Sequence, residues 1–233
     1  MRVAVIPARG GSQRIPRKNI KLFCGKPMIA WSIEAAIASQ CFDQVWVSTD
    51  DLEIAEVAKA HGATVPFIRP ENLSNHHCGT IPVIAHAIEW AQSQNLEISA
   101  ACCIYATAPM IDPNDVRRTL DIFQQNDYDY VFTATRYAFP IQRAFFMNEQ
   151  QCVEMFDAEQ FNSRSQDLVE AFHDAGQFYW GRPAAWTESR PIFGAKSRPF
   201  ILPRYRVQDI DTTEDWTQAE LMFKQIQISN QLK

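Results

Sequence analysis

Seven basic residues precede the first acidic side chain of the sequence, Glu34. The chain has 22 Lys and Arg residues and a net charge of −5, and these seven are Arg2, Arg9, Arg14, Arg17, Lys18, Lys21 and Lys26. Most lie in the segment IPARGGSQRIPRKN, where Gly10 and Gly11 would let the backbone approach a ligand closely. A cationic, glycine-containing loop of this kind is typical of a polyphosphate site.

The loop follows residues 3–6, an apolar, β-branched run that predicts a strand buried on both faces. In a doubly wound sheet, ligands bind beyond the carboxyl ends of the strands, and the first loop usually holds phosphate. Arg9 could neutralise phosphate oxygens bidentately and Lys18 as a point charge, with backbone N–H groups near Gly10 and Gly11 as further donors. The spacing matches neither the Walker pattern nor Gly-x-Gly-x-x-Gly, which disfavours P-loop and dinucleotide sites. A solvated basic loop is the alternative.

Two carboxylates, Asp209 and Asp211, lie close together near the C-terminus. In an extended segment they point the same way while Ile210 turns toward the core. Such a pair could hold Mg²⁺, which takes one or two carboxylates at nucleotide sites. Alternatively, Asp211 is an ordinary carboxylate at the N-terminus of the next helix.

Two further polar groups could bind a ligand. Arg69 and Thr80 could hydrogen-bond a base or ribose, although Ser74 or Thr80 could equally cap a helix. Arg164 and the segment 173–181, HDAGQFYWG, combine charged and amide groups with aromatic rings. These residue types suit a polyhydroxylated acid, although a strand with flanking polar residues explains most of them.

Composition limits the possible classes of protein. A length of 233 residues, 46% of them hydrophobic, favours a single domain spanning residues 1–233. The negative net charge argues against nonspecific binding to nucleic acids or anionic membranes. The six cysteines form no Cys-x-x-Cys pair or metal-ligand spacing, and we find neither a signal-peptide apolar region nor a membrane span. We therefore expect a soluble, cytoplasmic protein with reduced thiols.

Strand-like and helix-like segments alternate along the chain. Strands are expected at 3–6, 44–49, 64–68, 100–105, 130–135, 177–180 and 198–202. Helices are expected at 28–39 with Pro27 as its first residue, then at 52–60, 80–94, 113–125 and after the capping box at 212–215. This alternation predicts a Rossmann-like, doubly wound α/β fold with a mostly parallel sheet. Residues 137–165 break the pattern with several exposed aromatics, which predicts an excursion that contacts another subunit.

Five blocks of the sequence together resemble the CMP-sialic acid synthetase family of cytidylyltransferases. They occur in the family's order over nearly the whole chain, and they are IPARGGSQRIPRKN, VSTDD at 47–51, RPENLS at 69–74, YATAP at 105–109 and QDIDTTEDW at 208–216. The resemblance implies a nucleotide-diphospho-sugar transferase type of fold, a dimerisation excursion, a homodimer and dependence on Mg²⁺.

The resemblance also implies a role for particular residues. Those expected to bind the nucleotide are Ala8, Arg9, Gly10, Gly11, Ser12, Lys18, Asn19, Arg69 and Thr80. Those expected to bind the sugar are Tyr105, Arg164, His173, Gln177 and Tyr179. Asp209 and Asp211 would hold the metal and, with Arg9 and Lys18, perform catalysis.

The implied substrates are CTP and a nine-carbon 2-keto sugar acid, whose anomeric hydroxyl attacks the α-phosphate. Within the family, the stretches YATAP, NSRSQDLVEAFHDAGQFYWG and PRYRVQDIDTTEDW most resemble members that act on pseudaminic acid, which favours this acceptor. The sialate enzymes have Gln where this chain has Tyr105, which disfavours N-acetylneuraminate. Legionaminic acid, N-acetylneuraminate and Kdo are alternatives; Kdo is disfavoured because Kdo synthetases typically continue Arg-Leu-Pro-Gly-Lys-Pro after the Pro-Ala-Arg block. A different class of protein, a noncatalytic CTP-sensing module, would not require the carboxylate pair.

Overall fold

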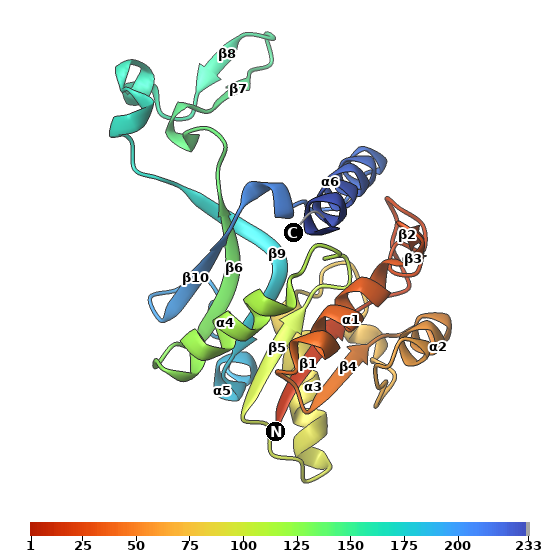
Figure 1. The fold of residues 1–233 in the computed structure, drawn as a ribbon. Coiled ribbons are helices and arrows are strands. Elements are labelled where there is room, and N and C mark those ends of the chain that lie inside the picture. The colour runs from red at the N-terminus through yellow and green to blue at the C-terminus, as the bar shows by residue number, and fades with distance from the viewer. Residues whose placement is uncertain (232–233) are drawn as a thin grey trace.

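The protein is built on a central six-stranded sheet with the strand order β10-β6-β9-β5-β1-β4. The structure is a computed structural model and describes residues 1–231. The six strands are β1 (Arg2–Pro7), β4 (Gln44–Ser48), β5 (Ala100–Ile104), β6 (Tyr130–Arg136), β9 (Phe172–Gly181) and β10 (Ser197–Leu202). Only β9 runs antiparallel to its two neighbours. The predicted α/β fold with a mostly parallel sheet is confirmed (Figure 1).

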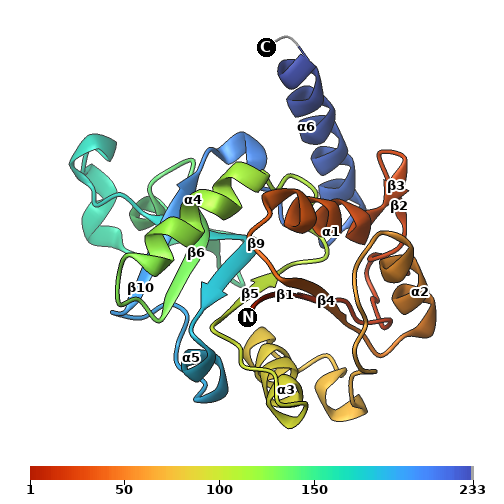
Figure 2. The same cartoon turned by 60° about the horizontal axis from the view of Figure 1, so that its bottom comes forward.

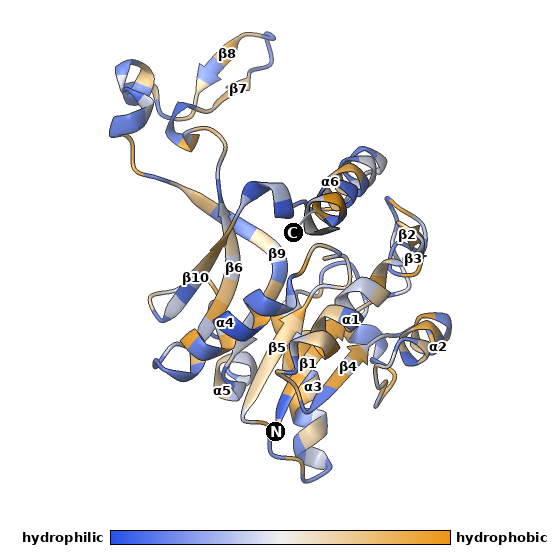
Figure 3. Cartoon of the chain, in the orientation of Figure 1, coloured by the Kyte–Doolittle hydropathy of each residue, from blue (hydrophilic) through white to orange (hydrophobic). Residues whose placement is uncertain are grey.

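Helices cover both faces of this sheet (Figure 2). The helices are α1 (Met28–Ser39), α2 (Leu52–Ala60), α3 (Thr80–Ser93), α4 (Pro113–Gln124), α5 (Pro183–Thr187) and α6 (Thr213–Gln231). Helices α1 and α4 lie on one face, and α3 and α5 on the other. Because strand side chains alternate between faces, Val3 and Val5 enter the core under α3 while Ala4 and Ile6 enter the core under α1. Both faces of the central strands are therefore hydrophobic (Figure 3).

The predicted caps at the starts of α2 and α6 are present, whereas the predicted start of α1 is one residue too early. The Asp51 side chain accepts a hydrogen bond from the Ile54 N–H and caps α2. At the start of α6, the Thr212 hydroxyl accepts from the Asp215 N–H while the Asp215 carboxylate accepts from the Thr212 N–H, so the predicted capping box is confirmed. Pro27 directly precedes α1 instead of being its first residue.

A third hydrophobic cluster joins α6 to the N-terminal segment. The Phe23 ring, in the small hairpin of β2 (Leu22–Phe23) and β3 (Lys26–Pro27), lies 5.4 Å from the Trp216 ring and 5.5 Å from the Phe223 ring. Ile210 is fully buried in the same cluster. This packing brings the acidic segment before α6 next to the basic N-terminal loop.

One strand prediction is wrong. Residues 64–68 make only two isolated bridges to the β4 region, Trp46 to Thr64 and Thr49 to Ile68. Pro66 lies between these two bridges and has no N–H to donate to a ladder, which explains why pairing does not continue. A short 3₁₀ helix, η1 (Glu71–Leu73), follows this segment.

The excursion between β6 and β9 is present and extends away from the body of the protein (Figure 1). It contains the hairpin of β7 (Phe145–Met147) and β8 (Val153–Met155) and three short 3₁₀ helices, η2 (Ile141–Arg143), η3 (Ala158–Asn162) and η4 (Ser165–Asp167). We call residues 137–171 the arm. It is six residues longer than predicted because β9 begins only at Phe172.

No helix in residues 1–231 is long and apolar enough to cross a bilayer.

All six cysteines are free thiols. A last 3₁₀ helix, η5 (Arg204–Arg206), connects β10 to the acidic segment.

Candidate functional site

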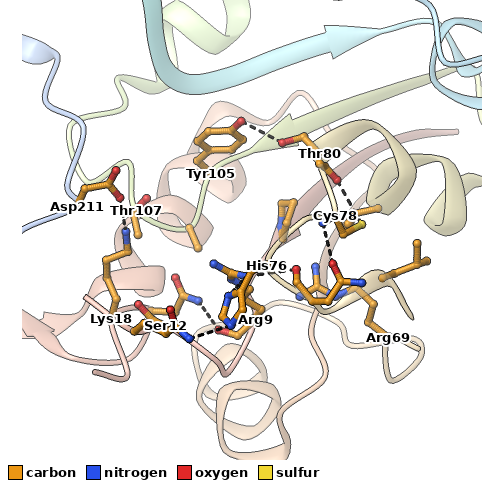
Figure 4. A pocket seen from close by; sticks show the side chains of 18 of the residues that line it. Arg9, Ser12, Lys18, Arg69, His76, Cys78, Thr80, Tyr105, Thr107 and Asp211 are labelled. Atoms are coloured by element: carbon orange, nitrogen blue, oxygen red, sulfur yellow. Dashed lines mark hydrogen bonds and ion pairs between the residues drawn. The ribbon is translucent and has the colours of Figure 1, made fainter. Parts of the chain in front are cut away.

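A cavity of about 570 Å³ opens beyond the carboxyl ends of β1 and β5 (Figure 4). Its lining contains four cationic side chains and one carboxylate, which are Arg9, Arg14, Lys18, Arg69 and Asp211. It also contains Ser12, Gln13, Asn19, His76, Cys78, Thr80, Tyr105 and Thr107. An excess of positive charge in a concave site of this size suits a polyanionic ligand.

The basic loop and the acidic segment meet in this cavity. The Lys18 Nζ donates to the Ile210 carbonyl at 2.6 Å and lies 3.3 Å from the Asp211 carboxylate. Arg14 makes a second ion pair with Asp211, at 2.8 Å. Groups separated by more than 190 residues in the sequence are thus in direct contact.

Arg9 has uncharged partners. Its guanidinium donates to the Asn75 carbonyl at 3.2 Å and contacts the His76 Nδ1 at 2.9 Å. Because a guanidinium can only donate, Nδ1 of His76 must be the acceptor in this contact. The Nε2 of His76 lies 3.0 Å from the amide of Gln13. These contacts orient Arg9 without neutralising its charge.

The other early basic residues are engaged elsewhere. Arg17 is paired with Asp51 and Glu53, and these hydrogen bonds raise the pKa of Arg17. The hydrogen bond from Arg17 also lowers the pKa of Asp51. Lys26 pairs with Glu34, and Lys21 lies over the Trp216 ring. Only part of the basic cluster therefore faces the cavity, a division that residue types alone do not reveal.

Two residues of the predicted phosphate loop have structural roles. The Gly10 N–H donates to the Asp50 carboxylate at 3.0 Å, and a Cβ on Gly10 would lie 2.6 Å from the Asp51 carboxylate. The structure therefore shows a close approach of this glycine to Asp51, and its contact with a ligand stays a prediction. Ala8 is buried, and its N–H donates to the Ser48 carbonyl. Ala8, Gly10 and Gly11 are not part of the cavity lining, whereas Ser12 is.

Asn19 organises the loop from within. Its side-chain amide donates to the Arg9 carbonyl at 2.9 Å, and its own carbonyl accepts from the Ile29 N–H at 2.8 Å. Asn19 is largely buried. It therefore ties the backbone at Arg9 to the start of α1.

Arg69 is only 5% exposed yet lines the cavity. Its Nε donates to the Ser74 hydroxyl at 3.2 Å, and its guanidinium lies 3.7 Å from the Asp50 carboxylate. Burial lowers the pKa of Arg69. Ser74 is the C-cap of η1 and not an N-cap, and Thr80 is the first residue of α3 with Gly79 as its N-cap, so the N-cap alternative is wrong for both residues.

The acidic pair is divided. Ile210 is buried as predicted, and Asp211 lines the cavity, but Asp209 is not part of the lining. Asp209 is exposed at the surface, yet the surrounding protein removes enough hydration to raise its pKa, and the nearby Asp211 raises it further. Repulsion between two neighbouring carboxylates would be relieved by a divalent cation, so this pair fits Mg²⁺. Within residues 1–231, no cluster of three or more His, Cys, Asp or Glu side chains could hold a metal.

Of the predicted sugar-binding residues, Tyr105 lines the cavity. Its hydroxyl lies 3.0 Å from the Thr80 hydroxyl, and burial raises its pKa (Figure 4). Tyr179 is buried behind it, with the two ring centroids 5.3 Å apart. Gln177 is also buried and donates to the Arg206 carbonyl.

His173 and Arg164 lie outside the cavity. His173 is partly buried, with its ring 4.8 Å from the Tyr137 ring at the base of the arm. Arg164 is exposed on the arm and paired with Asp167. Contact between either residue and a sugar remains a prediction.

Sequence reasoning did not assign a site role to several lining residues, among them Gln13, Arg14, His76, Cys78 and Thr107. Arg14 lies within the basic loop, so the positive charge of that loop is a signal that could have assigned it to the site. His76 had no such signal, because it enters the cavity only through the fold of the segment between η1 and α3.

The sheet, the cationic cavity at its carboxyl edge and the adjacent carboxylates define a nucleotide-binding α/β protein. The chain belongs to the cytidylyltransferase family, because the family model described as "Cytidylyltransferase" matches residues 3–229. It is 49% identical to the pseudaminic acid cytidylyltransferase of Campylobacter jejuni subsp. jejuni serotype O:23/36 (strain 81-176), over 95% of this chain and 96% of that protein.

More distant relatives agree with this assignment. The N-acylneuraminate cytidylyltransferase A of Danio rerio is 34% identical over 93% of this chain and 49% of its own length. A solved structure of CMP:2-keto-3-deoxy-manno-octonic acid synthetase complexed with CTP matches with a TM-score of 0.69 and 20% identity, covering 96% of this chain and 98% of that one. At this identity the structural match supports the fold alone.

Proposed function

We propose that the protein forms CMP-pseudaminic acid and pyrophosphate from CTP and pseudaminic acid. The observation that carries the proposal is the meeting of Arg9, Arg14, Lys18 and Asp211 around one cavity. The choice of acceptor is supported by the 49% identity to an enzyme named for pseudaminic acid and by Tyr105 at the cavity wall.

In the proposed reaction, the anomeric hydroxyl of the sugar acid forms a bond to the α-phosphorus and the bond to the β-phosphate oxygen breaks. The hydroxyl proton is lost and pyrophosphate leaves. Arg9 and Lys18 would neutralise the triphosphate and the departing pyrophosphate. Arg14 is a third cation on the same wall.

Arg69 and Thr80 would bind the nucleoside, and Tyr105 the sugar acid. Catalysis would depend mainly on positioning the substrates and neutralising charge, because nucleotidyl transfer of this kind requires little covalent participation by the protein. The carboxylate of Asp211 now holds Lys18 and Arg14, and both cations can exchange this partner for phosphate oxygens when CTP enters.

Asp209 and Asp211 would hold Mg²⁺ in the proposed enzyme. When bound, Mg²⁺ would neutralise the α-phosphate and lower the pKa of the attacking hydroxyl. The surroundings of Asp209 support this role, because burial and the nearby Asp211 raise its pKa and a divalent cation would favour the charged carboxylate.

We further propose a homodimer in the cytoplasm formed through the arm. The arm exposes large apolar side chains, including Phe139 at 83% and Phe156 at 72% exposure. Apolar area of this kind often marks a subunit contact. Sedimentation of wild type and Phe145→Asp would test this, since a monomeric wild type would refute the dimer.

The assay for the activity is pyrophosphate release with CTP, UTP or ATP against a panel of nonulosonic acids and Kdo, with mass spectrometry of the product. We expect release with CTP and pseudaminic acid that requires Mg²⁺. Equal or faster release with N-acetylneuraminate would refute the choice of acceptor. CTP binding without pyrophosphate release on any acid would favour a CTP-sensing module instead.

A further inference from the structure

Strand β9 contains a large bulge next to the inner wall of the cavity. Along its pairing with β6, Phe132 faces Tyr179 and Ala134 faces Asp174, so the single residue Thr133 lies opposite residues 175–178. On the other side, β9 keeps a regular ladder with β5, which continues as the Tyr105 N–H donates to the Gln177 carbonyl at 2.8 Å. The ladder with β5 ends at this bond, so it flanks residues 177–181 and does not reach the part of the bulge at residues 174–176.

The bulge brings Asp174 and Tyr179 into contact. In a regular strand, residues five apart lie about 17 Å from each other and point to opposite faces. Here the Tyr179 hydroxyl donates to the Asp174 carboxylate at 2.5 Å. The other oxygen of Asp174 accepts from the Gly176 N–H at 2.9 Å, and Gly176 has a φ of +61°, which glycine adopts readily.

This pair lies directly behind the cavity wall. Tyr179 is 1% exposed, its ring packs against the Tyr105 ring, and the two phenols are close enough to affect each other's pKa. Burial raises the pKa of both phenols, so each keeps its single proton. The Tyr179 proton is committed to Asp174, because a carboxylate is the strongest acceptor available to it.

We propose that Asp174 is a positioning residue for the acceptor end of the cavity. By holding the Tyr179 proton, it leaves the Tyr105 hydroxyl paired with Thr80 and directed toward the ligand. Bulges are common next to active sites, where they re-aim side chains. The proposal rests on the proposed function, because it depends on the assignment of Tyr105 to the recognition of the sugar acid.

The substitution Asp174→Asn tests this at nearly constant shape. The amide NH₂ can donate to the Tyr179 oxygen, which frees the Tyr179 proton to turn toward Tyr105 and compete with Thr80. We expect kcat/KM for the sugar acid to fall on the order of tenfold, the usual effect of losing a hydrogen bond to a charged group, with KM for CTP unchanged. Asp127→Asn, an 83% exposed carboxylate in a surface ion pair, is the matched control and should behave as wild type.

Tyr179→Phe provides a second route, because it removes the hydroxyl and keeps the ring. If Asp174 acts through Tyr179, the double variant should lose no more activity than either single variant. Additive losses, or a fall that affects KM for CTP as much as KM for the acid, would overturn the proposal.

Wild-type activity separates this test from that of the proposed function. The acid used is the one that wild type converts fastest in the panel, so an unexpected acceptor still permits the comparison of variants. If wild type converts none, the proposed function is refuted and this inference falls with it. If Asp174→Asn does not fold, as judged by thermal unfolding, Tyr179→Phe and Tyr105→Phe decide, and unchanged acid kinetics in both would overturn the proposal.

Discussion

Replacing Gly10 with alanine separates two explanations for a glycine in the basic loop. If the glycine allowed a ligand to approach, Gly10→Ala would weaken CTP binding and leave stability unchanged. In the structure, the added Cβ would instead lie 2.6 Å from the Asp51 carboxylate, closer than real Cβ contacts allow. We therefore expect Gly10→Ala to destabilise the fold.

The magnitude follows from what Asp51 does. Displacing its carboxylate would break the cap of α2, a hydrogen bond of 3.0 Å to the Ile54 N–H, which is worth about 1 kcal/mol. It would also disturb the pair with Arg17, whose side chains are 38% and 20% exposed and whose contribution is about 0.5–1 kcal/mol. The expected loss is about 2 kcal/mol, or roughly 4–8 °C in Tm for a chain of this size.

Urea unfolding of wild type, Gly10→Ala and Gly11→Ala would measure this. Gly11→Ala is the matched control, because a Cβ there meets nothing within 4 Å, and we expect its stability to change by no more than about 0.5 kcal/mol. Equal losses in the two variants would refute the reasoning. So would an unchanged midpoint for Gly10→Ala accompanied by weaker CTP binding.

Three other predictions concern the site and its support. Asp211→Ala should lower turnover on the order of 10²- to 10³-fold in a pyrophosphate-release assay, and full Mg²⁺-dependent activity would refute its role. Arg9→Ala should raise KM for CTP, whereas Arg17→Ala should lower the urea midpoint without raising that KM; the reverse pattern would contradict the division of the basic cluster. The folded-state pKa of Asp51 is depressed, so its contribution to stability is present above its unfolded pKa and is lost as pH falls through its folded pKa. Acid unfolding of wild type and Asp51→Asn should therefore converge at low pH, and a constant difference down to acid pH would contradict this sign.

Much of the architecture could be predicted from local patterns. Runs of apolar residues on both faces indicate strands inside a parallel sheet. Asp51 and the Thr212–Asp215 pair cap α2 and α6 through hydrogen bonds to backbone N–H groups only a few residues away. The failure at residues 64–68 is also local in origin. The apolar run predicts a strand, but Pro66 removes a ladder donor at its centre and only isolated bridges form.

The site could be predicted only in part, because the sequence does not show which ion pairs each charged side chain makes in the folded protein. In the sequence, the basic residues of the loop cannot be distinguished by their type or spacing. In the structure, Arg14 and Lys18 pair with Asp211, whereas Arg17 pairs with Asp51. The difference arises from the α6 cluster, which brings residues near 210 to the loop. Hydrophobic contacts across more than 190 residues leave no periodic signal near either partner.

The sequence by itself determined the class of fold and the kinds of group that could bind a triphosphate, because strand and helix patterns and residue chemistry are local properties. The tertiary structure alone decided that Gly10 accommodates Asp51, that His76 orients Arg9, and that a bulge in β9 joins Asp174 to Tyr179. The first two depend on which distant segments the packed cores bring together, and the bulge depends on how β9 pairs with β5 and β6, so all three are properties of the whole chain.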